Sequence, residues 1–90
     1  MVQMRRYRLK EGAKEEFQKV FLETIVPLRK ALGFEILGAY WLSDRDFLWF
    51  VAHEDFARAE EAYYNHPERQ KVNPRAFLEE VETQFVERLL

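Results

Sequence analysis

Two histidines and several aromatic residues are the groups in this sequence that could do chemistry. His53 ends an apolar run beside Glu54 and Asp55, so its imidazole could act as a general base or hydrogen-bond the start of the next helix. Tyr7 and Tyr40 each join an aromatic body to a hydroxyl group that can donate a hydrogen bond. For an enzyme, these residue types predict His53 as the proton acceptor and Tyr7, together with Tyr40, as hydrogen-bond donors.

Aromatic and basic residues also form a candidate ligand-binding set. Aromatic side chains with a polar tip suit a small apolar or aromatic ligand, although core packing or dimer packing would use the same residues. An arginine of the first apolar segment that faces inward needs an anionic partner, either from a second subunit or from a ligand carboxylate. The expected ligand-binding residues are Arg5, Tyr7, Tyr40, Trp49 and His53.

The composition excludes several chemistries. The chain has no cysteine, which excludes disulfides, thiolate metal sites, iron–sulfur clusters and thiol nucleophiles. His53, His66 and a carboxylate lack a diagnostic metal-ligand spacing, and Ser43 is the only serine. No glycine-rich phosphate loop is present. We therefore predict no metal site and no cofactor.

Charge and hydropathy narrow the possible partners. Fourteen Lys and Arg against sixteen Asp and Glu give a net charge of −2, so the global charge does not favour nucleic acid or an anionic membrane. No apolar run approaches the roughly 18 residues of a membrane span, and no signal-peptide core follows Met1. We expect a cytoplasmic protein with neither nucleic-acid nor membrane partners.

The order of structural elements follows from periodicity. Ninety residues predict a single domain, 1–90, because a chain of this length forms one core. Residues 2–9 predict a first strand. Apolar residues between 13 and 32 recur every three or four positions, which predicts a helix with one buried stripe, a bend at Pro27 and an end at Gly33.

The second half of the chain also predicts strands followed by helices. The runs 34–42 and 47–53 predict two strands joined by a tight turn, with Asp44 and Arg45 as its central residues. Asp55 is a candidate N-cap for a helix to about Tyr64. A short helix from Pro67 and a last strand near 81–89 complete a βαββαβ order.

Both faces of the predicted hairpin are apolar. With that turn, one face holds Ile36, Gly38, Tyr40, Leu42, Phe47, Trp49, Val51 and His53, and the other holds Leu37, Ala39, Trp41, Leu48, Phe50 and Ala52. Right-handed crossovers place both helices on the same side of the sheet, so the chain itself covers only one face. The second set therefore predicts the interface of a homodimer, with an apolar patch on the order of 500 Å² per subunit.

Three stretches of the sequence resemble one protein family. They are MRRYRLKEG at 4–12, PLRK at 27–30 with LGF at 32–34, and YYNHPE at 63–68. These stretches resemble the NIPSNAP proteins of the dimeric α/β-barrel superfamily. The resemblance implies a ferredoxin-like α+β fold, with a four-stranded antiparallel sheet, helices on one face, a sheet-to-sheet dimer and a pocket in each subunit. It implies no defined activity, and Arg69 stands where many relatives have an aromatic residue.

Two alternative function classes use the same element order. The superfamily also resembles cofactor-independent monooxygenases, isomerase-type enzymes and haem-degrading enzymes, but the stretch 68–73 lacks the histidine that would bind haem iron. RNA-recognition motifs share the βαββαβ order, yet Asp46 and Leu48 stand where the glycines of their third-strand signature belong. The sequence therefore favours a small homodimer that binds an apolar or aromatic ligand, with an enzyme as the alternative.

Overall fold

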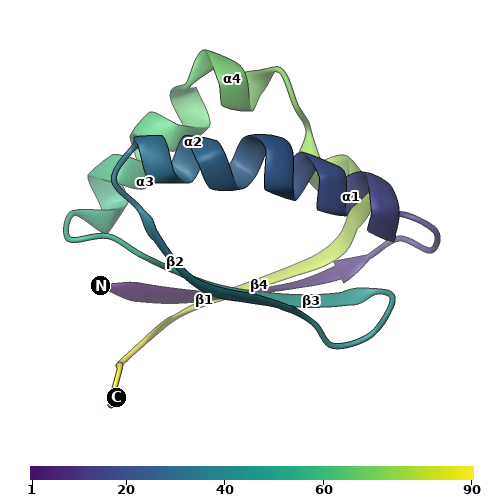
Figure 1. Cartoon of the computed structure of the whole chain (residues 1–90), viewed down its shortest axis with the longest axis horizontal. Helices are drawn as coiled ribbons and strands as arrows, with labels where there is room; N and C mark the ends of the chain where they lie inside the picture. The colour runs from purple at the N-terminus through teal and green to yellow at the C-terminus, as the bar shows by residue number, and fades with distance from the viewer.

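A four-stranded antiparallel sheet carries all the helices on one of its faces (Figure 1). The computed structural model describes residues 1–90. The strands lie in the order β2-β3-β1-β4, with bounds β1 Val2–Leu9, β2 Glu35–Trp41, β3 Asp46–Ala52 and β4 Leu78–Val86. The helical segments are α1 Lys14–Val20, η1 Phe21–Ile25, α2 Val26–Ala31, α3 Phe56–Asn65, α4 Pro67–Gln70 and η2 Pro74–Phe77. The predicted ferredoxin-like α+β fold is confirmed.

The first helix changes its winding where the sequence predicts a bend. Pro27 has no backbone N–H to donate to the carbonyl of Glu23, and the helix accommodates this loss by a π-helical segment, η1, directly before α2. The helix then continues to Ala31, and Gly33 follows it with a φ of +89°, as expected for a glycine stop. The π-helical segment begins at the buried Phe21 and precedes the buried Arg29, and both of these side chains contact Trp49 of the sheet.

An aromatic core fills the space between the helices and the sheet. Phe21 packs edge-on against Phe47 and Trp49 of β3, with ring centroids 4.9 and 5.1 Å apart. Tyr7 of β1 and Phe17 of α1 complete the centre of the cluster, and all five of these residues are buried. Aromatic pairs at such distances stabilise a core beyond their area alone, by roughly 0.5–1.5 kcal/mol each.

The register of the β2–β3 hairpin differs from the prediction by one residue at the turn. Trp41 pairs with Phe47 and Ala39 pairs with Trp49, so both β2 residues lie on the helix-covered side and not on the bare side as predicted. A bulge between Ile36 and Gly38 then shifts the pairing by one further residue, which returns Ile36 to the face on which it is predicted. Three residues, 43–45, lie between the last paired residues, because the backbone N–H of Leu42 donates to the carbonyl of Asp46.

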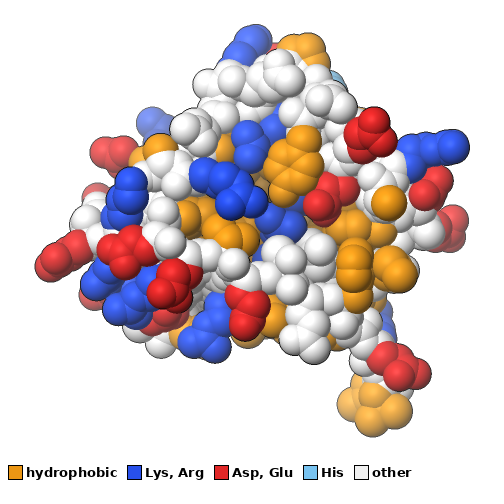
Figure 2. Space-filling model, turned by 180° about the vertical axis from the view of Figure 1, so that it is seen from behind, with side chains coloured by type: hydrophobic (Ala, Val, Ile, Leu, Met, Phe, Trp, Pro, Cys, Tyr) orange, Lys and Arg blue, Asp and Glu red, His pale blue; other side chains and the backbone are white.

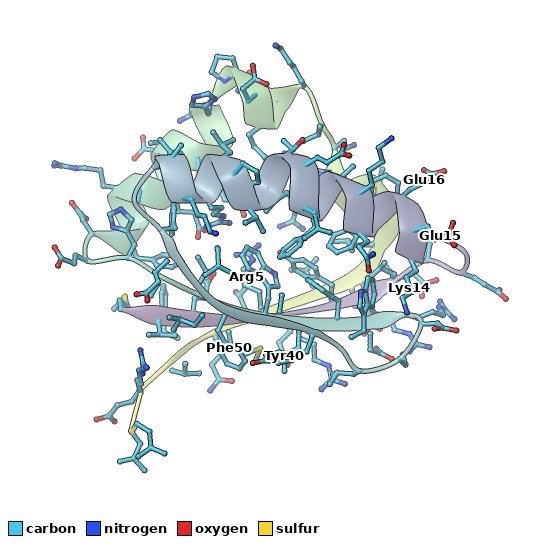
Figure 3. All side chains as sticks on the ribbon, viewed as in Figure 1. Arg5, Lys14, Glu15, Glu16, Tyr40 and Phe50 are labelled. Atoms are coloured by element: carbon cyan, nitrogen blue, oxygen red, sulfur yellow. The ribbon has the colours of Figure 1, made fainter.

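The opposite face of the sheet has no helix over it. In Figure 3 the side chains of Tyr40 and Phe50 point away from the helices, whereas Arg5 points toward them. Pairing registers place the following residues on this bare face: Val2, Met4, Arg6, Arg8, Glu35, Gly38, Tyr40, Asp46, Leu48, Phe50, Ala52, Glu80, Glu82, Gln84 and Val86. Its apolar half lies over β2, β3 and the start of β1, and its charged half lies toward β4 and the end of β1.

Candidate functional site

An arginine-lined cleft opens between the helices and the β1–β4 side of the sheet. The cleft is narrow, because the cavity inside it measures only about 20 Å³, and about 350 Å³ is reached only when the open space around its mouth is counted. Figure 2 shows Lys and Arg side chains gathered among hydrophobic ones near the middle of the face seen from behind. The lining residues are Arg5, Tyr7, Ile25, Arg29, Trp49, Tyr63, Tyr64, Arg69, Pro74, Arg75, Leu78 and Val81. Four of them are arginines and none is acidic, so the cleft is basic over an apolar and aromatic wall.

Arg5 is fixed inside this cleft by three hydrogen bonds. Its Nε donates to the Tyr7 hydroxyl at 2.7 Å, and Nη1 donates to Gln3 Oε1 at 2.8 Å. Nη2 donates to the Tyr64 hydroxyl at 3.2 Å, which ties β1 to α3. Arg5 is 5% exposed. Burial by itself lowers the pKa of Arg5, but Tyr7, Tyr64 and Glu60 together raise the pKa overall, so the guanidinium stays charged.

Arg29 is buried more deeply than Arg5 and is less well paired. The side chain comes from α2 and is 1% exposed, with its Cζ 4.0 Å from the ring centroid of Tyr63 and 4.7 Å from that of Phe34. Stacking on aromatic rings stabilises a guanidinium, but it uses none of the N–H donors. The Nε and Nη1 atoms of Arg29 have no hydrogen-bond partner.

One carboxylate lies between the two buried arginines. Glu60 Oε2 is 3.8 Å from Nη1 of Arg29 and 3.9 Å from Nη1 of Arg5. At these distances the carboxylate contributes charge but no hydrogen bond, and Glu60 Oε2 is itself without a hydrogen-bond partner. Arg69 of α4 lies at the rim, with its Cζ 5.2 Å from the ring centroid of Tyr64.

The structure brings together three of the five predicted ligand-binding residues. Arg5, Tyr7 and Trp49 all line the cleft. Trp49 is 1% exposed, and its indole Nε1 has no hydrogen-bond partner. Tyr40 does not lie with them, because it is 54% exposed on the bare face of the sheet. The expected placement of Tyr40 is wrong because the hairpin turn contains one more residue than predicted.

His53 lies outside the cleft, at the junction of β3 with α3. Its Nε2 is 3.1 Å from the carbonyl oxygen of Leu32, and its Nδ1 accepts the backbone N–H of Asp55 at 2.9 Å. This pair of contacts sets the tautomer, with the proton on Nε2. Both nitrogens are therefore used within the fold, which matches the alternative interpretation of His53 as a residue that hydrogen-bonds the start of the next helix. Asp55 is at the N-cap position, but its side chain makes no capping bond.

The predicted interface residues divide between the two faces. Leu48, Phe50 and Ala52 lie on the bare face as expected. Ala39 and Trp41 lie on the helix side, where Trp41 Nε1 donates to Gln18 Oε1 of α1 at 2.8 Å. Leu37 is the unpaired residue of the bulge and is half-buried. The two corrections follow from the same one-residue change in register.

Sequence reasoning missed Arg29, Tyr63, Tyr64 and Arg69 as cleft residues. A signal for Arg29 was present, because Arg29 follows Phe21 and Ile25 at intervals of four along the apolar stripe of the first helix. A charged residue on a buried stripe indicates a buried ion or a binding site. Tyr63 shares an apolar stripe of the second predicted helix, α3, with Phe56 and Ala59, a pattern that by itself indicates only core packing, and Arg69 had no signal beyond its departure from the family pattern.

The remaining polar residues of the chain form no second candidate site. No group of three or more His, Asp or Glu residues is arranged to hold a metal ion. None of the helices has both the length and the apolar character required to cross a membrane. His66 caps α4, since its Nδ1 accepts the backbone N–H of Glu68 at 3.1 Å.

Comparisons with known proteins identify the fold. No protein-family model and no curated protein matches the sequence. An uncharacterized NIPSNAP domain protein from Burkholderia xenovorans is 24% identical with a TM-score of 0.78, over 98% of this chain and 94% of that chain. A NIPSNAP family protein from Agrobacterium tumefaciens is 18% identical with a TM-score of 0.79, over 92% and 87% of the two chains.

A second group of similar structures carries a different name. A putative antibiotic biosynthesis monooxygenase from Bacteriodes thetaiotaomicron is 17% identical with a TM-score of 0.77, over 100% of this chain and 90% of that one. Several of the similar structures are named NIPSNAP proteins, which confirms the predicted resemblance at the level of the fold. Identities this low establish a shared architecture.

Proposed function

We propose that this chain, which shares its fold with NIPSNAP proteins, is a small homodimeric protein that binds a small apolar or aromatic ligand in the arginine-lined cleft. The observation that carries the proposal is the cleft wall itself. It combines the rings of Trp49, Tyr63 and Tyr64 with buried N–H donors that have no partner, such as Trp49 Nε1. Pockets with an apolar wall and a few unused polar groups are typical of small-molecule sites.

The bare face of the sheet supports the dimer. An apolar patch on the order of 500 Å² at about 25 cal/mol per Å² gives an upper bound of roughly 12 kcal/mol per subunit. Two subunits together exceed the roughly 4–15 kcal/mol that association costs. Arg6 and Arg8 share this face with Glu80 and Glu82, so two copies related by a two-fold axis can align opposite charges.

Sedimentation equilibrium of the Phe50→Glu variant tests the dimer. Phe50 is at the centre of the apolar half of the bare face, and a carboxylate there would be buried without a partner on dimerisation. We expect the unchanged protein to be a dimer at micromolar concentration and Phe50→Glu to be a monomer. Leu22→Glu is the matched control, because Leu22 is 59% exposed on the helix η1. A monomeric unchanged protein would overturn the dimer.

Native mass spectrometry of the purified protein tests ligand binding. We expect a small molecule retained in up to one copy per subunit and lost from the Val81→Trp variant, whose larger side chain would fill the cleft. Leu22→Trp places the same side chain on an exposed surface and should keep the ligand. Retention of the same molecule by Val81→Trp would locate binding elsewhere.

A second candidate function is cofactor-independent oxygenation or isomerisation of a small aromatic or carbonyl compound. The similar structures named putative antibiotic biosynthesis monooxygenases favour it. Within the cleft, the hydroxyl groups of Tyr7 and Tyr64 both accept a hydrogen bond from Arg5, and each retains a proton that it can donate to substrate. The residue assignment derived from the sequence adds His53 as the proton acceptor, but His53 lies outside the cleft with both ring nitrogens hydrogen-bonded, so the geometry supports Tyr7 and Tyr64 better than His53.

Oxygen uptake with a dihydroxynaphthalene substrate tests this second candidate. Uptake should fall by at least tenfold in Tyr7→Phe, since a hydrogen-bond donor to the reacting group contributes on the order of that factor or more. Turnover that survives in His53→Ala would remove His53 from the mechanism. Absence of uptake in the unchanged protein, with ligand binding intact, would leave binding alone as the function.

A further inference from the structure

We propose that the ligand of the cleft is a small monocarboxylate with an apolar or aromatic body, and that Arg29 receives its carboxylate with help from Arg69. This inference rests on the proposed ligand-binding function and specifies the chemical class of the ligand. It starts from three observations: the unused donors of Arg29, the excess of positive charge around them, and the apolar wall beside them.

The unused donors of Arg29 are the first observation. A buried guanidinium normally has its N–H groups hydrogen-bonded, because an unpaired buried cation is strongly destabilising. Arg29 is 1% exposed, yet Nε and Nη1 have no acceptor within the chain. The rings of Tyr63 and Phe34 hold the guanidinium by stacking, which leaves its N–H edge for an acceptor.

The charge balance is the second observation. Arg5 and Arg29 are both buried, and the carboxylate of Glu60 is the only acidic group that approaches them within 4 Å. Two positive charges and one negative charge leave an excess of one positive charge at the inner end of the cleft. Arg69 and Arg75 at the rim add to the positive potential. A ligand with one negative charge would neutralise the inner excess.

The lining of the cleft selects the form of that anion. Ile25, Pro74, Leu78 and Val81 provide aliphatic contacts, and Trp49 and Tyr64 provide rings. A carboxylate matches the fork of a guanidinium with two parallel hydrogen bonds, and an attached hydrocarbon body gains free energy from the apolar wall. Inorganic phosphate has no apolar surface to bury against that wall. The chemistry of the cleft therefore fits an organic monocarboxylate.

Isothermal titration calorimetry with three probes tests the inference: benzoate, the neutral benzyl alcohol of similar size, and the smaller inorganic phosphate. We expect benzoate to bind at least tenfold more tightly than benzyl alcohol, since charge-assisted hydrogen bonds are about twice as strong as neutral ones. The NMR signal of the Trp49 indole N–H should shift with benzoate, and that of Trp41, which donates to Gln18, should not.

Variants of the arginines test which of them bind the carboxylate of benzoate. Arg69→Gln removes a rim arginine that is half-buried, and we expect about a tenfold loss of benzoate affinity with no loss for benzyl alcohol. Arg29→Lys keeps the charge but loses the planar fork and should weaken benzoate by a similar factor. Arg58→Gln is the matched control, because Arg58 is exposed on α3 away from the cleft lining.

Each outcome separates this inference from the proposed function. Equal affinity for benzyl alcohol and benzoate, with the Trp49 signal shifted by both, would overturn the carboxylate and leave an apolar binding site. Tight phosphate binding with no effect of the aromatic body would also overturn it and indicate an inorganic anion site. Absence of any saturable shift at Trp49 would overturn both the inference and the ligand-binding function.

Discussion

Arg29 and Glu60 show how a buried ion pair can be incomplete. The Glu60 carboxylate is shared between two guanidinium groups at 3.8 and 3.9 Å, so it compensates one of two charges and hydrogen-bonds neither. Binding sites commonly retain such unsatisfied groups at a cost in stability, because the same groups serve the ligand. The charges at this position therefore control stability as well as recognition.

Replacing Glu60 by glutamine should destabilise the protein. Glu60→Gln removes the only negative charge near Arg5 and Arg29, which leaves two buried cations close together. We expect the free energy of unfolding to fall by about 2 kcal/mol, less than for a fully buried pair because the Glu60 side chain is 26% exposed. Urea unfolding measures this change. Glu61→Gln, at the exposed neighbouring position, should alter the free energy by less than about 0.5 kcal/mol.

His53 should matter for stability through its two hydrogen bonds. The imidazole joins the carbonyl at the end of the first helical region to the backbone N–H of Asp55, and alanine would remove both contacts. We predict that His53→Ala lowers the free energy of unfolding by about 1–3 kcal/mol. Glu54→Ala, at an exposed position next in the chain, is the control. Unchanged urea unfolding of His53→Ala would contradict this structural role.

The sequence predicted the face on which a side chain lies where the residue belongs to a regular strand without a bulge. Arg5, Tyr7 and Trp49 alternate with outward residues along β1 and β3, so period-two reasoning places them together. Tyr40 was misplaced because its side depends on the exact length of a turn. Arg29 was missed because a helix stripe is normally assigned from its apolar members alone.

The turn between β2 and β3 explains the error in register at the scale of elements. A two-residue turn was predicted, but Ser43 closes a longer loop in which its hydroxyl accepts the backbone N–H groups of Arg45 and Asp46. The same hydroxyl donates to Asp46 Oδ2 at 2.7 Å. A serine at the start of a loop is able to replace a backbone turn in this way, and the bulge in β2 then restores the inward direction of Ile36.

Acid should lower the stability of this turn, because protonation of Asp46 removes its contribution to the free energy of unfolding. The Ser43 hydroxyl and, after it, the charge of Arg8 hold the pKa of Asp46 below its usual value. Because the folded-state pKa is lower than the unfolded-state pKa, the contribution of Asp46 is present above about pH 4 and is lost as the pH falls through the lower folded value.

The Asp46→Asn variant tests this contribution. Its free energy of unfolding, measured by urea at a series of pH values between 6 and 2, should fall less steeply on the acid side than that of the unchanged protein. Asp44→Asn is the control, because the Asp44 side chain is 93% exposed in the same loop. Parallel acid profiles for Asp46→Asn and the unchanged protein would remove Asp46 as the source of the effect.

The whole molecule has one covered and one bare face of its sheet, and this asymmetry was predictable. Right-handed crossovers fix both helices on one side whatever the register of the hairpin, so the sequence is sufficient for the layer order. The two faces of β3 were also predictable, because successive side chains of a strand point to opposite sides. Which β2 residues lie on which face could not be predicted, because the length of the turn and the bulge determine it locally.

Thermal stability should depend on protein concentration if two copies cover the bare faces. Dimerisation stabilises the folded state by mass action, so the midpoint of thermal unfolding should rise as the concentration increases from about 1 to about 100 μM. The Phe50→Glu variant should show a lower midpoint that no longer changes with concentration. Differential scanning calorimetry measures both, and a concentration-independent midpoint for the unchanged protein would contradict the dimer.

The central position of β1 governs the order in which the chain can fold during synthesis. β1 is made first, yet its two neighbours in the sheet are β3 and β4, and β4 ends at Val86. Pairing across most of the sequence is slow, because the intervening chain has to be closed into loops before the contacts form. In a nascent chain leaving the ribosome, β3 can therefore cover one edge of β1 early, whereas the other edge stays unpaired until β4, the last strand, emerges.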